Sequence, residues 1–207
     1  MMADRCVQTA EACQTDPSKC DLSKNLCSAW ETTPYYQTGL NPYDIRMPCE
    51  DPGLCYNFSN VETFLARSDV LSALHVRTEE SAAWTECNYD VNGDFSADWM
   101  KGYQGYVADL LNAKIPVIIY AGDVDFVCNW MGNKAWTMAL DWSGSESFNS
   151  AGDHSWLDKA GDKAFGAARS ASGFTFLQIF EAGHMVPQDQ PQAALQMLNT
   201  FITGGTF

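Results

Sequence analysis

The chain has 207 residues, of which 46% are hydrophobic and 13% aromatic, and this composition is that of a globular rather than a disordered protein. Such a length is enough to bury one core, or one core with a small appended module. The 26 acidic and 12 basic residues give a net charge of −14, so no basic stripe is available for nucleic acid or an anionic membrane. No uncharged apolar run reaches the roughly 18 residues that would predict a membrane span.

The N-terminal part, residues 1–60, is polar and rich in cysteine. Its first four cysteines recur every seven residues, and the turn Asp16-Pro17-Ser18 breaks what would otherwise be one long helix. We therefore expect two helical arms that fold back on each other. The expected disulfides of this hairpin are Cys13–Cys20 on the inside and Cys6–Cys27 on the outside.

Two further cysteines, Cys49 and Cys55, flank the turn Glu50-Asp51-Pro52-Gly53 and are expected to close a small loop. No spacing reads Cys-x-x-Cys, so no metal site is expected. Asn57-Phe58-Ser59 marks Asn57 as a glycosylation acceptor, although such sequences are also common by chance. Eight cysteines indicate an oxidising compartment, yet no charged-then-apolar leader precedes them. We therefore expect the chain to begin inside a longer protein.

From Val61 onward, apolar residues follow helical or strand spacing. Buried strands are predicted at Ile115–Tyr120 and Phe174–Phe180, and weaker strands at Asp153–Trp156 and Lys163–Ser170. Helices are predicted at Val61–Ala66, Val70–Leu74, Trp99–Asn112, Asn129–Leu140 and Gln192–Ile202. This α/β order is typical of a parallel sheet with crossover connections, which places ligand chemistry outside the carboxyl ends of the strands.

An acid and a histidine follow the two buried strands. The first strand is followed by Asp123 and Asp125, and the second by His184. A carboxylate and then a histidine at strand ends are the last two members of a Ser…Asp…His triad in α/β-hydrolase order. Both aspartates are candidates for the acid. The bulk of Phe126 and Val127 favours Asp125, because a catalytic carboxylate needs a fixed and poorly hydrated position.

The serine of such a triad is not found in these residues. A hydrolase elbow reads Gly-x-Ser-x-Gly on a strand-to-helix turn, and no such match occurs. The nearest serines, in Ser143–Ser147, follow Asp125, whereas the serine of this chain order precedes the acid. We therefore expect it upstream of Met1. Cys128 is the only nucleophile near the acid, and we interpret it as a wall of the pocket rather than the attacking group.

Two longer stretches, Gly122–Trp136 and Gly183–Pro187, closely resemble the serine carboxypeptidases, particularly those of the carboxypeptidase Y type. Shorter matches in the same order are Tyr36–Gly39, Asn41–Arg46, Leu54–Tyr56, Cys87–Asp90 and Asp98–Lys101. The resemblance implies the C-terminal half of an α/β-hydrolase fold. Residues 1–60 would form a disulfide-braced lid insertion, and residues 61–207 the core that carries the acid and the base.

The resemblance also implies roles for individual residues. Asp125 would be the triad acid and His184 the triad base, and the three disulfides agree with the family pattern. Cys87 would lack its partner, which in the family lies in the N-terminal half. The implied substrate-binding residues are Cys128, Met185, Tyr43 and Tyr56.

The complete enzyme of this family would release C-terminal residues from peptides, without a cofactor. The nucleophile elbow and the oxyanion-hole amides belong to an N-terminal half that is absent from these residues, so the chain alone is expected to be inactive. The alternatives are a carboxypeptidase-like acyltransferase or hydroxynitrile lyase, or a non-catalytic folded fragment. The cysteines and the acidic composition favour a vacuolar or lysosomal location, or secretion.

Overall fold

The computed structural model describes residues 2–50, 54–77 and 84–207. They form two compact units, one within residues 1–34 and 49–101 and the other within residues 35–48 and 102–207. The units are not divided at residue 60, and the assignment of residues 1–60 to a lid and 61–207 to a core stays a prediction. None of the described helices is both long and apolar enough to cross a membrane.

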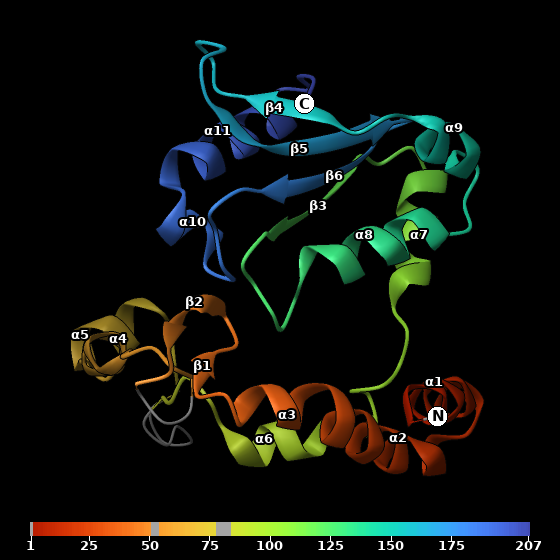
Figure 1. Ribbon diagram of the computed structural model, residues 1–207. Coiled ribbons are helices and arrows are strands. Elements are labelled where there is room, and N and C mark those ends of the chain that lie inside the picture. Colours follow the sequence, from red (N-terminus) through yellow and green to blue (C-terminus); the bar gives the residue numbers. More distant parts are fainter. Residues whose placement is uncertain (1, 51–53, 78–83) are drawn as a thin grey trace. The chain divides into compact units, whose positions relative to one another are not determined.

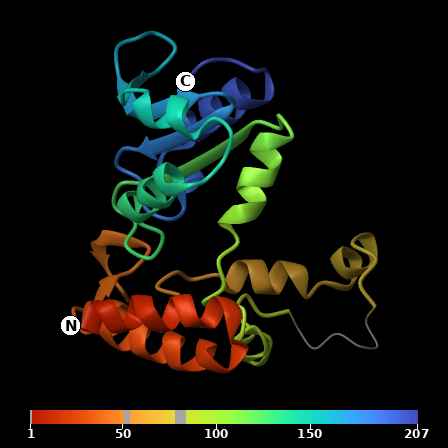
Figure 2. The ribbon, with the colours of Figure 1, turned by 90° about the vertical axis from the view of Figure 1, so that its right-hand side faces the viewer.

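The first unit begins with a helical hairpin, drawn in red and orange-red in Figure 2, where its two arms lie side by side. Helix α1 (Met2–Thr15) and helix α2 (Cys20–Cys27) are joined by a 3-10 turn, Pro17–Lys19, which Asp16 caps by accepting the Ser18 N–H at 3.0 Å. Disulfides join Cys6 to Cys27 and Cys13 to Cys20. Both predicted pairs and the predicted hairpin are therefore confirmed.

The rest of the first unit consists of short elements. A disulfide joins Cys49 to Cys55 as predicted, while residues 51–53 of the predicted turn lie outside the described residues. The helices predicted from Val61 and Val70 are found close to their expected positions. The elements are a π-helical turn (Ser28–Thr32), α4 (Ser59–Leu65), α5 (Ser68–Ala73) and α6 (Tyr89–Asp94).

The second unit is built on a four-stranded sheet in the order β3-β6-β5-β4 (Figure 1). Strands β3 (Val117–Gly122) and β6 (Phe174–Ile179) are parallel neighbours, in register from Val117 opposite Phe174 to Gly122 opposite Ile179. Strands β5 (Ala164–Ala171) and β4 (His154–Leu157) continue the sheet in antiparallel pairing. The predicted parallel sheet with crossover connections is therefore found for β3 and β6. It is wrong for β4 and β5, because tight connections link β4 to β5 and β5 to β6 without a crossover helix.

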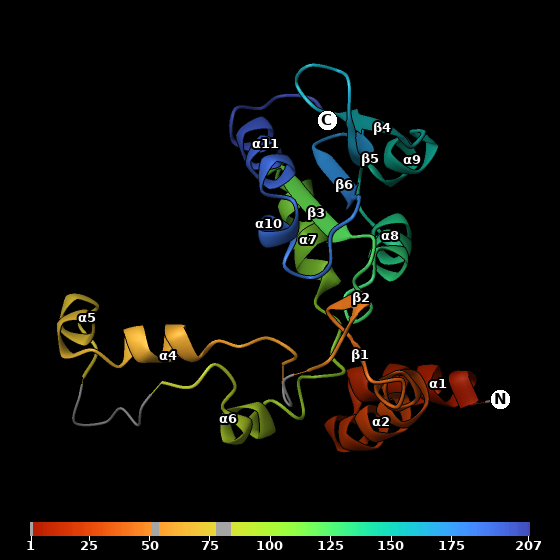
Figure 3. The same cartoon turned by 60° about the vertical axis from the view of Figure 1, so that its left-hand side comes forward.

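Helices cover both faces of this sheet, as Figure 3 shows for α10 and α11 on one side and α8 and α9 on the other. The expected helix over Trp99–Asn112 begins only at Gln104, so its first five residues are not helical. The helices of this unit are α7 (Gln104–Asn112), α8 (Trp130–Ala139), α9 (Ser145–Ser150), α10 (Val186–Asp189) and α11 (Pro191–Ile202).

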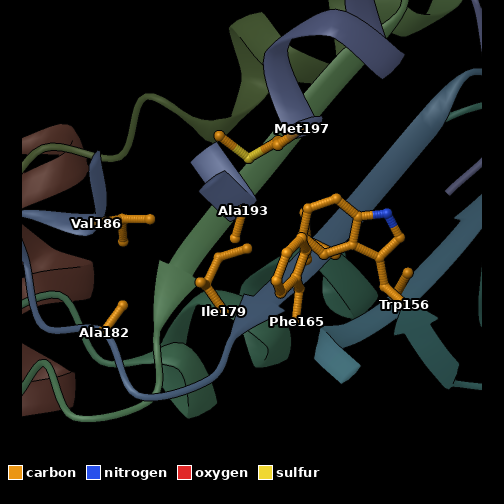
Figure 4. Close-up of a cluster of buried hydrophobic side chains, with 9 residues drawn as sticks. Trp156, Phe165, Ile179, Ala182, Val186, Ala193 and Met197 are labelled. Atoms are coloured by element: carbon orange, nitrogen blue, oxygen red, sulfur yellow. The ribbon is translucent and has the colours of Figure 1, made fainter. Parts of the chain in front are cut away.

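Alternating side chains of β6 enter two separate cores. Phe174 and Phe176 pack with residues of α7 and α9, whereas Leu177 and Ile179 belong to the cluster that includes α11. Figure 4 shows part of this second cluster, in which Ala193 and Met197 of α11 lie over Ile179 and Phe165. Because β6 is buried on both faces, its carboxyl end is held firmly, and so is the start of the loop that follows it.

A short hairpin precedes the sheet in sequence and belongs to the same unit. A helical turn, α3 (Thr33–Tyr36), leads into β1 (Leu40–Asn41), which pairs antiparallel with β2 (Asp44–Pro48). No strand was predicted here, because the segment is short and has no alternating apolar pattern.

Candidate active site

The acid loop, residues 123–129, connects β3 to α8. Asp125 is 5% exposed, and its Oδ1 atom accepts the backbone N–H of Cys128 at 3.1 Å. At the end of the loop, the Asn129 side chain caps α8 by accepting the Gly132 N–H at 2.8 Å. Hydrogen bonds within its own loop and with the start of α8 thus orient the Asp125 side chain independently of the base loop.

The base loop, residues 180–185, connects β6 to α10. Its second residue, Glu181, has a φ of +57°, which lies in the left-handed region that is unusual for a residue other than glycine. Gly183 donates its N–H to Asp189 Oδ2 at 2.7 Å, and His184 donates its N–H to the Tyr43 carbonyl at 2.8 Å. Figure 1 shows that this loop and the acid loop leave the same end of the sheet.

Asp125 and His184 meet between the two loops. The Oδ2 atom of Asp125 lies 2.9 Å from Nδ1 of His184. The Asp125 side chain is 3% exposed and the His184 side chain 36% exposed. A buried carboxylate therefore holds one ring nitrogen of a histidine that solvent can still reach, which is the relation that a catalytic acid and base require.

The other aspartate, Asp123, does not contact the imidazole in the described hydrogen bonds. Burial raises the pKa of the Asp123 carboxyl, while the backbone N–H groups of Glu181 and Ala182 and the charge of Arg46 lower it by less. Its Oδ1 atom is buried and has no hydrogen-bond partner in the described part of the chain. Of the two aspartates, Asp125 is therefore the one that bonds the histidine.

A close approach of the two loops depends on glycine. A Cβ atom on Gly122, the last residue of β3, would lie 2.1 Å from the Ala182 carbonyl oxygen and 2.3 Å from that of Gly183. A Cβ atom on Gly183 would lie 2.3 Å from the Tyr43 carbonyl oxygen. Any larger residue would push these backbones apart, so Gly122 sets the spacing between the end of β3 and the base loop, and Gly183 sets the spacing between the base loop and Tyr43.

The residues that the family resemblance implies for substrate binding do not all lie near His184. The Tyr43 ring lies 5.2 Å from the His184 ring, centroid to centroid, and Met185 follows His184 directly as a half-buried residue. Tyr56 belongs to the first unit, where its ring packs edge-on against Phe58 at 6.0 Å. Its role in a pocket stays a prediction.

Cys128 lies beside the acid–base pair. It is a free cysteine whose residue is exposed overall, yet partial desolvation of its thiol, followed by the negative charge of Asp125, raises its pKa. A raised pKa leaves the thiol protonated at neutral pH, whereas a nucleophilic cysteine needs a thiolate. In the described residues, no hydrogen bond joins Cys128 to His184. Both observations favour the interpretation of Cys128 as a pocket wall.

The same three side chains are the ones that could bind a metal here. One atom each from Asp125, Cys128 and His184 lie within 4.8 Å of one another, and carboxylate, thiolate and imidazole are all zinc ligands. Two of these groups already bond each other, through His184 Nδ1 and Asp125 Oδ2. The expectation of no metal stays a prediction.

An ion cluster next to the base loop was missed by sequence reasoning. Arg46 Nε donates to Asp44 Oδ1 at 2.9 Å, Arg46 Nη2 lies 2.5 Å from Asp44 Oδ2, and Arg46 Nη1 donates to the Glu181 carbonyl at 3.2 Å. The hydrogen bond from Arg46 lowers the pKa of Asp44, which is 1% exposed. An Asp-x-Arg spacing puts both side chains on one face of a strand, and this was the available signal.

A carboxylate after one strand and a bonded histidine after its parallel neighbour are the arrangement of an α/β hydrolase. A crystal structure of a prohormone-processing carboxypeptidase from Saccharomyces cerevisiae has the same fold, with a TM-score of 0.70 at 24% identity. The similarity covers 94% of this chain and 43% of that structure.

The sequence pattern of the serine carboxypeptidases matches residues 1–204, and the chain belongs to that family. Carboxypeptidase Y of Candida albicans is 44% identical over 205 residues, which cover 97% of this chain and 37% of the relative. Carboxypeptidase Y of Saccharomyces cerevisiae is 40% identical over 207 residues, covering 98% of this chain and 38% of that protein. The chain thus spans less than two fifths of the length of these relatives.

Proposed function

We propose that this chain supplies the acid and the base of a serine carboxypeptidase that releases C-terminal residues from peptides. The observation that carries the proposal is the hydrogen bond between Asp125 and His184 at the carboxyl ends of β3 and β6. The serine nucleophile and the oxyanion-hole donors would come from an N-terminal portion that these residues do not contain.

In the proposed reaction, His184 donates its Nδ1–H to Asp125 and leaves Nε2 to accept the proton of the serine hydroxyl. The serine oxygen attacks the scissile carbonyl, and His184 then gives the proton to the leaving amine. In the second half of the cycle, water replaces serine: its proton passes to Nε2, its oxygen attacks the acyl group, and the proton returns to the serine. Asp125 holds the imidazole in the required tautomer throughout.

Three residues around His184 are proposed to contact the substrate. Tyr43 offers an aromatic face, Met185 an apolar side chain, and Cys128 a protonated thiol, so this surface suits apolar residues of a peptide. Tyr56 is proposed as a further substrate-binding residue on the strength of the family resemblance alone. These contacts would set residue preference rather than carry out the chemistry.

The proposed location is an oxidising compartment, vacuolar or secreted. The three disulfides support it, because such bonds are rare where thiols are kept reduced. Asn57 is proposed as a glycosylation site in this setting. It is exposed at the start of α4, and its Oδ1 atom accepts the Ser59 N–H at 3.0 Å.

A chimera tests the proposal. The part of Saccharomyces cerevisiae carboxypeptidase Y that this chain matches is replaced by the chain, and release of the C-terminal residue from an N-blocked dipeptide is followed. We expect turnover in the chimera and its loss in the His184→Gln variant. The 207-residue chain alone should give no turnover, because one missing oxyanion donor already costs about 3 kcal/mol. A folded chimera that does not hydrolyse the dipeptide would contradict the proposal.

A further inference from the structure

The β1–β2 hairpin makes hydrogen bonds to both the acid loop and the base loop. The turn between β1 and β2 and the first residues of β2, residues 42–46, are hereafter called the clamp. The clamp makes backbone hydrogen bonds to both the acid loop and the base loop. They run from Phe126 N–H and Val127 N–H to the Pro42 carbonyl at 3.1 and 3.0 Å, from Ile45 N–H to the Val124 carbonyl at 3.0 Å, and from His184 N–H to the Tyr43 carbonyl at 2.8 Å.

The clamp ends in an arginine whose side chain reaches the base loop. The Arg46 guanidinium forks onto the carboxylate of Asp44, whose side chain is 2% exposed, and its third nitrogen donates to the Glu181 carbonyl at 3.2 Å. A guanidinium is a rigid, permanently charged fork, so the bonds to Asp44 fix the direction in which Nη1 points. Glu181 is thereby tied to the clamp.

The backbone of Glu181 needs such support. Its positive φ turns the chain from β6 toward His184, and a residue with a Cβ atom adopts this conformation only when its surroundings hold it. Two side chains donate to its carbonyl, Arg46 and Gln190, the second through Nε2 at 3.2 Å. Asp189, which accepts the Gly183 N–H, lies 3.9 Å from Arg46 Nη2.

We infer that Arg46 is a positioning residue for His184. It acts through Glu181: by holding this carbonyl, it fixes the turn that aims His184 Nδ1 at Asp125. The catalytic consequence rests on the proposed function, but the positioning itself is a property of the folded chain. Without Arg46, the base loop loses a donor at its strained residue, and the imidazole is free to turn away from Asp125.

The tautomer of His184 reports this positioning. An imidazole that donates from Nδ1 to a carboxylate is fixed as the Nδ1–H form, whereas a released imidazole also samples the Nε2–H form. The ring-nitrogen shifts of the ¹⁵N-labelled chain distinguish the two at a pH where the ring is neutral. We expect the Nδ1–H form in the wild type and its loss in Arg46→Met and in Arg46→Lys.

The two substitutions separate positioning from folding. Lysine keeps a positive charge beside Asp44 but cannot fork onto it and reach Glu181 as well. If Arg46→Met fails to fold, Arg46→Lys decides the question. Arg67→Met is the matched control: it removes an Arg–Asp pair of the same spacing, with Asp69 at 2.7 Å, from an exposed position in the first unit. Its His184 tautomer should equal the wild type, and His154 provides an internal reference in every sample.

The inference is overturned if His184 keeps the Nδ1–H form in folded Arg46→Lys or Arg46→Met, or if the wild-type chain lacks this form. Because the readout needs no turnover, it is independent of the chimera assay. An inactive chimera together with a loss of the tautomer in the Arg46 variants would reject the proposed function and keep the positioning role.

Discussion

Gly122 and Gly183 bring the backbones of the acid and base loops into contact, with no room for a side chain on the first. An added Cβ on Gly122 would lie 2.3 Å from the Gly183 carbonyl oxygen, closer than any packed atoms tolerate. The same region carries two hydrogen bonds that extend the pairing of β3 and β6, from Asp123 N–H to the Ile179 carbonyl and from Val124 N–H to the Ala182 carbonyl. Contacts between backbone atoms therefore determine the distance between the acid loop and the base loop.

The Gly122→Ala substitution should lower stability by about 1–3 kcal/mol, because the surrounding atoms are backbone and cannot move aside cheaply. Urea unfolding of the two chains measures the difference. Gly105→Ala in α7 is the control: its Cβ would meet nothing within 4 Å, so it should stabilise the helix by about 0.5–1 kcal/mol. Equal stability of Gly122→Ala and the wild type would show that the loops are not in contact.

Local sequence was sufficient for the parts of the fold that depend on local pattern. The apolar runs at Ile115–Tyr120 and Phe174–Phe180 gave strands near their observed positions, and the spacing of Cys6 to Cys27 gave the helical hairpin. The sequence did not indicate whether β4 and β5 pair in a parallel or an antiparallel direction. Both are short, and their antiparallel pairing depends on neighbours rather than on their own residues.

The choice between Asp123 and Asp125 shows the same limit within the site. The sequence placed both carboxylates after one strand, and only bulky neighbours favoured the second. The loop geometry separates them, since Asp125 bonds His184 while Asp123 is associated with the amides of Glu181 and Ala182. Arg46 was missed for a related reason, because its contact with Glu181 spans 135 residues of sequence.

The rate at which iodoacetamide alkylates Cys128 should rise at a higher pH than for an ordinary thiol. Burial and the charge of Asp125 raise its pKa, so the thiolate that attacks iodoacetamide forms above the usual midpoint of about 8.5. The rate of alkylation is measured against pH in a Cys87→Ser background, which removes the other free cysteine. Asp125→Asn should bring the midpoint down. A midpoint below 8 would instead indicate an activated cysteine and reopen its role as a nucleophile.

The acid-pH stability of the chain should depend on Asp44. Its pKa is lowered by Arg46, so its contribution is fully present above about pH 4 and is lost as the pH falls through the lower folded value. At pH 7, Asp44→Asn should cost about 1–3 kcal/mol, because it removes charged hydrogen bonds from a buried carboxylate. At pH 3 the difference from the wild type should be smaller.

Urea titrations at the two pH values measure this change. Asp69→Asn is the matched control, since Asp69 pairs with Arg67 in the same geometry but lies exposed. Its effect on stability should be much smaller than that of Asp44→Asn at pH 7, because water screens the exposed pair. A difference between Asp44→Asn and the wild type that grows on acidification would have the wrong sign for this account.

The most direct test compares the two aspartates in the chimera with carboxypeptidase Y. Replacement of a triad aspartate by asparagine typically lowers kcat by about 10⁴-fold, because the imidazole is then held in the wrong tautomer. We predict a loss of this size for Asp125→Asn and a much smaller loss for Asp123→Asn, since only Asp125 bonds His184. Equal kcat values for Asp125→Asn and the unsubstituted chimera would contradict the assignment of Asp125 and His184 as the acid and base.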